Sequence, residues 1–142
     1  MKIGDDGMYN YYGYIPFLRI PHYQQKKAPS TISPSLYGVD PRQTLLYTNM
    51  DDTITQNLGN GFTRYVWANI DIIKPQEYVD YRLVTPSNEE VISAGFSTFP
   101  VTNIFPIQIA PVFEQTNIMV VMLHNQSQSM VLVDLWVITK KK

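Results

Sequence analysis

The chain has 142 residues, enough for one domain with a sizeable hydrophobic core. Charged residues make up 16% of the sequence, below the share of about a quarter usual in globular proteins. The formal net charge of −1 gives no indication of an extended nucleic-acid-binding surface, and the absence of cysteine excludes disulfides and thiolate metal sites. A surface with few charges repels its neighbours weakly, which favours packed assemblies.

The charges are unevenly distributed along the chain. Residues 1–42 hold five Lys/Arg and three Asp/Glu, a net +2, whereas residues 43–139 hold three and nine, a net −6. Lys140, Lys141 and Lys142 then add +3. An acidic body with basic ends can attract copies of itself, although a solvated, frayed tail is the simpler interpretation of the terminal lysines.

The first 42 residues are rich in proline and tyrosine. They contain five of the ten prolines and six of the ten tyrosines. Proline at this spacing removes backbone donors and disfavours helix at each preceding residue. The sequence therefore predicts an extended arm over residues 1–42 and a β-domain over residues 43–142.

The stretch GMYNYYGYIPF, residues 7–17, is the most distinctive part of this arm. In an extended conformation its tyrosines project to both sides, and tyrosine buries a large area while keeping a hydroxyl for a polar partner. We expect the stretch to bind a neighbouring subunit, or else to pack back along its own domain. The residues predicted to make these assembly contacts are Tyr9, Tyr11, Tyr12, Tyr14, Ile15 and Phe17.

After the arm, residues 40–43 fit a helix start, but residues 44–48 fit a strand because Thr and Tyr favour it. Residues 62–73 are predicted to form a strand. The face predicted to point inward carries Phe62, Val66, Ala68, Ile70 and Ile72.

Tyr65 and Trp67 lie two residues apart, so they share the other face of this strand. They form a possible aromatic platform for sugar rings or nucleobases. The pattern favours packing, as a second buried face or a subunit contact, over such a platform. Nucleic acid is not expected, because Arg64, Lys74 and Arg82 are the only cations of residues 43–139.

The remaining strands are predicted at residues 79–83, 92–96 and 107–109, with a hairpin of two long apolar strands over residues 117–139. Val131, Val133, Leu135 and Val137 should be core, and Asp134 needs a partner on the opposite face. We expect the two hairpin strands to be central in one sheet. The fold class is all-β, a single β-sandwich (jelly-roll-like) or barrel.

No catalytic, cofactor or metal site is predicted. His22 and His124 have no histidine at metal-ligand spacing, and no Gly-x-Ser-x-Gly elbow is present. Asp51-Asp52 is interpreted as a turn or helix cap, Glu89-Glu90 as an exposed turn, and the Gly4-Asp5-Asp6 triplet as a chance match. Asn125-Gln126-Ser127 matches a glycosylation acceptor pattern but is interpreted as turn chemistry. We expect the protein not to be an enzyme.

In composition and layout the chain resembles small virion proteins of bacteriophages and other viruses, as an Asn/Gln/Thr/Tyr-rich β-domain with an extended terminus such as residues 7–41. The resemblance implies a minor capsid, decoration, head-fibre or neck/tail component, located in the virion, with copies of itself and other structural subunits as partners. No secretion signal or transmembrane segment is predicted. The alternative is a carbohydrate-binding β-sandwich module that uses Tyr65 and Trp67.

Overall fold

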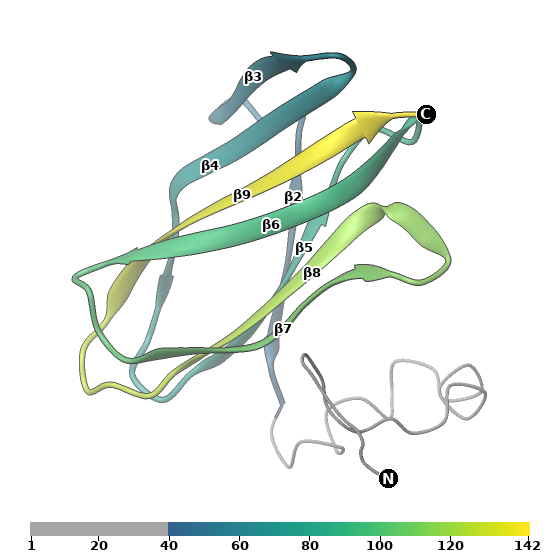
Figure 1. The fold of residues 1–142 in the computed structure, drawn as a ribbon. Coiled ribbons are helices and arrows are strands. Elements are labelled where there is room, and N and C mark those ends of the chain that lie inside the picture. Colours follow the sequence, from purple (N-terminus) through teal and green to yellow (C-terminus); the bar gives the residue numbers. More distant parts are fainter. Residues whose placement is uncertain (1–39) are drawn as a thin grey trace, which may run out of the picture. The chain divides into compact units, whose positions relative to one another are not determined.

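The computed structural model describes residues 40–142, so the arm residues from Tyr9 to Phe17 lie outside the described residues. Pro41–Lys142 form one compact unit. Within it, eight strands build two four-stranded sheets that enclose a core, which confirms the predicted all-β sandwich (Figure 1). Residues 40–142 contain no helix that is long and apolar enough to cross a membrane.

The first sheet has the order β2-β5-β8-β7, with β2 parallel to β5 and the other pairs antiparallel. Its strands are β2 (Arg42–Tyr47), β5 (Tyr78–Val84), β7 (Ile104–Val112) and β8 (Gln115–Asn125). The second sheet is antiparallel with the order β3-β4-β9-β6. Its strands are β3 (Thr53–Gly59), β4 (Phe62–Ile73), β6 (Glu89–Phe99) and β9 (Val131–Lys141).

The core lies between the sheets and follows the two-residue period of the strands. On β9 the alternate residues predicted as core, Val131, Val133, Leu135 and Val137, are all buried. Val79, Tyr81 and Leu83 of β5 and Met119, Val121 and Leu123 of β8 complete most of it from the first sheet. These inward residues are large or β-branched and apolar, which suits a half-buried pleated surface.

The predicted hairpin over residues 117–139 is wrong. β8 and β9 are both long and central, but β8 pairs with β5 and β7, whereas β9 pairs with β4 and β6. The connecting residues 126–130 therefore cross between sheets. The reason lies at Asn125, whose buried side-chain amide donates to the carbonyls of Ile73, Lys74 and Ser129 and so directs the chain toward the second sheet.

The predicted orientation of β4 is wrong except at Ile70, which packs against the core. Tyr65 and Trp67 point into the core, 7% and 0% exposed, while Phe62, Val66 and Ile72 point outward. Both faces of β4 are apolar, so alternation alone did not decide between them. The larger aromatic side chains fill the core, where the Tyr65 hydroxyl bonds to Glu89 and the Trp67 indole N–H donates to the Tyr47 carbonyl at 3.2 Å.

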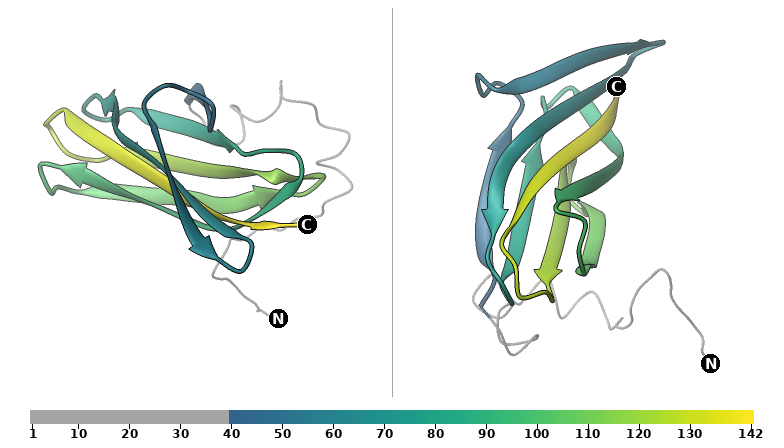
Figure 2. Two further views of the ribbon diagram at one scale, coloured as in Figure 1. Left: turned by 90° about the horizontal axis from the view of Figure 1, so that it is seen from above. Right: turned by 90° about the vertical axis from the view of Figure 1, so that its left-hand side faces the viewer.

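Two edge strands differ from expectation. β3 was not predicted; it forms a hairpin with β4 at one end of the sandwich through Gly59-Asn60-Gly61, all with positive φ (Figure 1, Figure 2). β7 is longer than the predicted residues 107–109, and its pairing shifts register near Pro106 and Pro111. Proline is tolerated there because β7 is an edge strand.

The strand interpretation of residues 44–48 is confirmed by β2, although β2 begins at Arg42.

Candidate interaction surface

The outer face of the β3-β4-β9-β6 sheet carries apolar side chains on all four strands. Alternation from the buried residues of β4, β6 and β9 places their apolar residues outward, and on β3 the pairing of Ile54 with Val66 does the same. We call this set the outer apolar face: Ile54, Phe62, Val66, Ile72, Ile92, Phe99, Leu132, Trp136 and Ile138. Phe99 is 73% exposed, and Ile54, Ile72 and Ile92 are about half exposed.

Strand register arranges much of this face in two rows across the sheet. Ile54, Val66 and Trp136 are direct cross-strand partners, and Gly95 continues that row on β6. In the second row Leu132 lies between Ile72 and Phe99. Direct cross-strand neighbours have Cβ atoms about 5 Å apart, so each row is a continuous apolar strip.

Gly95 makes room for the Trp136 indole. A Cβ atom added to Gly95 would lie 2.6 Å from Cε2 and 2.9 Å from Nε1 of Trp136, closer than real Cβ contacts allow. The indole therefore covers the Gly95 backbone. Because Trp136 is held against the sheet in this way, its opposite side is presented outward as part of the face.

A polar site around Asp134 separates the two rows. Its carboxylate accepts a hydrogen bond from the Asn69 backbone N–H at 2.6 Å and one from the Ser97 hydroxyl at 3.2 Å. Asn69 has φ of 48° and lies where β4 shifts register against β9. Asp134 thus fixes this bulge, and the prediction that it needs a partner on the face opposite the core is confirmed.

Arg42 joins the two sheets at the start of the described chain. From β2, its guanidinium donates to the Glu77 carboxylate at 2.7 Å, pairs with Asp71 at 2.9 Å and donates to the Ile72 carbonyl of β4 at 3.1 Å. The hydrogen bond to Glu77, with further help from Asp71, raises the pKa of Arg42. Burial alone would raise the pKa of Glu77, but hydrogen bonds from Arg42 and the Lys74 N–H outweigh it and lower that pKa. These contacts hold the end of β4 beside β2.

A buried polar group lies at the other end of the sandwich. Glu89 accepts hydrogen bonds from the Tyr65 hydroxyl at 3.0 Å and the Thr139 hydroxyl at 2.7 Å. Burial, followed by the contact with Glu89, raises the pKa of Tyr65 to about 12. The interpretation of Glu89-Glu90 as an exposed turn is thus wrong for Glu89, which begins β6 and is buried because hydroxyl donors satisfy it.

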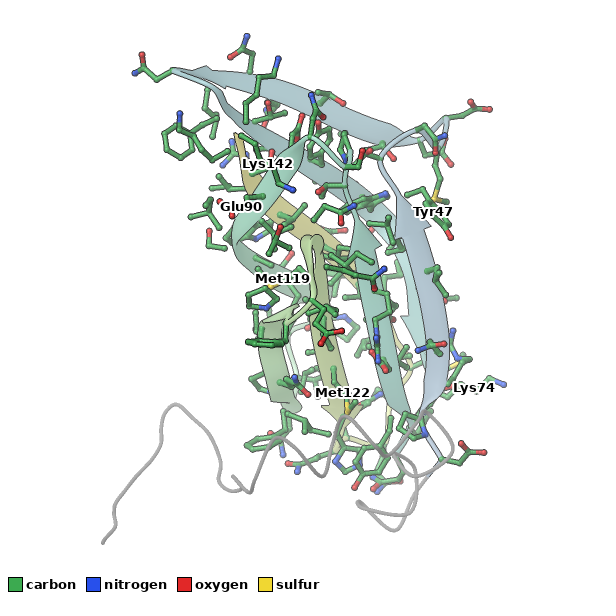
Figure 3. All side chains as sticks on the ribbon, turned by 90° about the vertical axis from the view of Figure 1, so that its right-hand side faces the viewer. Tyr47, Lys74, Glu90, Met119, Met122 and Lys142 are labelled. Carbon is green, nitrogen blue, oxygen red and sulfur yellow. The ribbon has the colours of Figure 1, made fainter. Side chains whose placement is uncertain are left out.

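The terminal lysines do not form a frayed tail. Lys140 and Lys141 belong to β9, and Lys140 Nζ donates to the Asn60 carbonyl at 2.9 Å and lies 5.1 Å from the centre of the Phe62 ring. Lys142 Nζ donates to the Ser87 carbonyl at 3.2 Å. Figure 3 shows Lys142 and Glu90 near one end of the sandwich and Lys74 near the other. Lys140, Lys141 and Lys142 therefore belong to the folded end that carries the β3–β4 hairpin.

Two residues considered for chemistry have structural roles. Asn125 is fully buried, and its side-chain oxygen accepts from the Ser127 backbone N–H and hydroxyl, so turn chemistry rather than glycan attachment is confirmed for Asn125-Gln126-Ser127. His124 stacks on Tyr78 with ring centroids 3.8 Å apart. Residues 40–142 hold no group of three or more His, Asp or Glu side chains that could bind a metal ion.

The structure does not form the predicted aromatic platform, because Tyr65 and Trp67 lie in the core. The exposed aromatic side chains of this sheet are instead on the outer apolar face, which sequence reasoning missed. A signal for it was present, because Leu132, Trp136 and Ile138 alternate with the core residues of β9, and Phe62, Val66 and Ile72 do the same on β4.

The fold is a β-sandwich whose β3-β4-β9-β6 sheet carries the outer apolar face. The model of the YjdH family matches residues 43–139, which include every strand except the first residue of β2 and the last two residues of β9, and the chain belongs to this family. No curated protein and no solved structure matches it.

Proposed function

We propose that this protein is a non-enzymatic structural subunit of a larger assembly. The observation that carries the proposal is the outer apolar face, with Ile54, Ile72, Ile92 and Phe99 each about half exposed or more. Monomeric proteins rarely leave a contiguous apolar patch of more than a few hundred Å² in water. Burial against a partner removes that area from water, at about 25 cal/mol per Å² before the costs of association.

The setting that we propose is a virion, with the protein as a minor capsid, decoration, head-fibre or neck/tail component. Its support is compositional: few charges, many uncharged polar residues and the Pro/Tyr-rich residues 1–42. Subunits packed at high density gain from weak mutual repulsion, which a low charge content provides. Copies of the same chain and other structural subunits are the proposed partners.

The carbohydrate-binding alternative now depends on a different aromatic residue. With Tyr65 and Trp67 in the core, a sugar ring would stack on an aromatic residue of the outer apolar face, such as Trp136 beside the polar groups of Ser97 and Asp134. An aromatic residue with Val66 and Ile138 as outward neighbours suits a protein surface better than a hydroxyl-rich sugar, because a sugar needs several hydrogen-bond partners.

Native mass separates these functions. The full chain is measured by light scattering after size-exclusion chromatography and by mass photometry over a range of concentrations. A structural subunit is expected to form an oligomer, and Trp136→Ser should shift it toward the monomer. For a glycan-binding module the chain would bind an immobilised glycan panel, and Trp136→Ser would abolish that binding without changing the native mass. A full chain that stays monomeric at all concentrations contradicts the proposal.

A further inference from the structure

The outer apolar face lies next to the point where the N-terminal arm joins the sandwich. Arg42, the first residue of β2, donates through its guanidinium to the carbonyl of Ile72. Ile72 opens the row that continues through Leu132 to Phe99. Arg42, the last residue of the predicted arm, therefore contacts the end of this row. The strand to which Arg42 belongs, β2, is part of the first sheet.

The arm is long enough to cross the face and to reach beyond it. From Phe17 to Pro41 the chain spans about 80 Å when fully extended. Four strands spaced about 4.8 Å apart make a face only about 15 Å wide between the outer strand axes. This maximum length exceeds the width of the face, so it permits contact with the corresponding face of an adjacent copy.

The side chains of residues 7–17 are complementary in kind to this face. The face offers two apolar strips with a polar site at Asp134 between them. The arm segment offers Ile15 and Phe17 with four tyrosines, whose rings bury apolar area and whose hydroxyls accept or donate hydrogen bonds. Ordering the segment costs about 1–2 kcal/mol per residue, which a continuous apolar surface can offset and isolated contacts cannot.

We propose that residues 7–17 of one copy dock on the outer apolar face of a neighbouring copy, across the Ile54–Val66–Trp136 row. This inference rests on the proposed function, since it names the surface through which the assembly forms. It commits to exchange between copies, because an arm that covered its own face would withdraw the outer apolar face from assembly.

Site-specific photo-cross-linking in the full chain tests the inference. Tyr12 is replaced by p-benzoylphenylalanine, and heavy-isotope-labelled and unlabelled chains are mixed before illumination. Mass spectrometry then identifies both the cross-linked peptide and whether it belongs to another copy. We expect mixed-isotope cross-links to peptides of β3, β4 and β9 that contain Ile54, Val66 or Trp136.

Two exposed aliphatic residues on edge strands form a matched pair of variants. Ile54 on β3 is 49% exposed and belongs to the face, whereas Leu45 on β2 is 47% exposed and points outward from the other sheet. Ile54→Lys should lower the yield of mixed-isotope cross-links about tenfold, the effect of weakening docking by about 1.4 kcal/mol. Leu45→Lys should leave the yield unchanged. Circular dichroism and thermal melting check that both variants are folded.

The outcomes separate this inference from the proposed function. Cross-links confined to a single isotope, cross-links to the β2-β5-β8-β7 sheet, or equal effects of the two lysine variants overturn the inference. If the native mass of the full chain is still oligomeric, the proposed assembly function stands and uses another contact. If the native mass is that of a monomer and no mixed-isotope cross-link forms, both fail.

Discussion

The hydroxyl of Tyr65 on β4 donates a hydrogen bond to the carboxylate of Glu89 on β6, with 3.0 Å between the oxygens, inside the sandwich. The two strands are not adjacent, because β9 lies between them, and Thr139 of β9 donates to the same carboxylate. One buried carboxylate thus ties three neighbouring strands together at the end that carries the β3–β4 hairpin.

Replacing Tyr65 by phenylalanine tests this tie. Tyr65→Phe removes one of the two hydroxyl donors to Glu89 and leaves the buried carboxylate less satisfied, so the free energy of unfolding should fall by about 1–3 kcal/mol. Urea denaturation at neutral pH, followed by circular dichroism, measures this change in the free energy of unfolding. A variant as stable as the original protein would show that Glu89 does not depend on this hydroxyl.

The same residue gives an alkaline pH dependence. The pKa of Tyr65 is raised to about 12 in the folded protein, above the value of about 10 in an unfolded chain. Between these values the unfolded chain binds fewer protons than the folded one. The contribution of Tyr65 to the free energy of unfolding is therefore complete below about pH 10 and is lost as the pH rises toward 12. The stability difference between the original protein and Tyr65→Phe should therefore shrink over that range, and a constant difference would contradict the assignment.

Arg42→Gln tests the junction between the sheets. The neutral side chain loses the ion pairs to Asp71 and Glu77, and the variant should lose about 1 kcal/mol of stability, because the guanidinium is partly exposed. The pKa of Glu77 is lowered in the folded protein. The contribution of Glu77 to the free energy of unfolding is therefore present above the unfolded pKa of about 4.3 and disappears as the pH falls through the folded pKa. Acid titration of the unfolding free energy should show a smaller decrease for Arg42→Gln than for the original protein.

Gly95→Ala tests the support of Trp136. The added methyl group would overlap the indole, so either the ring moves away from β6 or the strand shifts. We expect a loss of about 1–3 kcal/mol, as for other overpacked positions, together with a change in tryptophan fluorescence. Ser93→Ala, at the next outward position of β6, serves as the control because it adds no atoms. Equal stability and unchanged emission in Gly95→Ala would mean that the indole does not rest on this glycine.

Asn125→Asp tests the crossing between the sheets. The substitution preserves the shape of the side chain but removes the N–H donors and places a carboxylate beside the carbonyls of Ile73, Lys74 and Ser129. Because the site is fully buried, a loss of about 3 kcal/mol or more is expected. Thermal unfolding measures the loss. Asn103→Asp, whose amide makes an exposed contact with Gln126, should change stability far less.

Several features of the fold could be predicted from residue patterns. The strands at Phe62–Ile73, Tyr78–Val84 and Val131–Lys141 follow from β-branched and aromatic runs that begin after polar turns. The β9 core residues follow from strict alternation. β3 was missed because Thr53–Gly59 contains mostly polar residues and is exposed on both faces. Its sequence therefore lacks the alternation of apolar and polar residues that marks a half-buried strand.

The outer apolar face and the true orientation of β4 could not be derived in the same way. When both faces of a strand are apolar, a two-residue period gives two equally good solutions. The solution that forms is decided by residues far along the chain: Glu89 and Thr139 satisfy the Tyr65 hydroxyl, and the Tyr47 carbonyl accepts from Trp67. The sequence pair that suggested a ligand platform is therefore part of the core.

By itself the sequence determined the all-β class, the core positions of the last strand and a Pro/Tyr-rich start, because these depend on local periodicity and on backbone limits set by proline. The tertiary structure decided that β8 and β9 lie in different sheets, and that Trp136 rather than Trp67 faces outward. Those outcomes depend on hydrogen bonds between residues that are distant in the sequence, such as Asn125 with Ile73, 52 positions apart, and Trp67 with Tyr47, 20 positions apart. No local pattern encodes such partners, and only the folded chain brings them together.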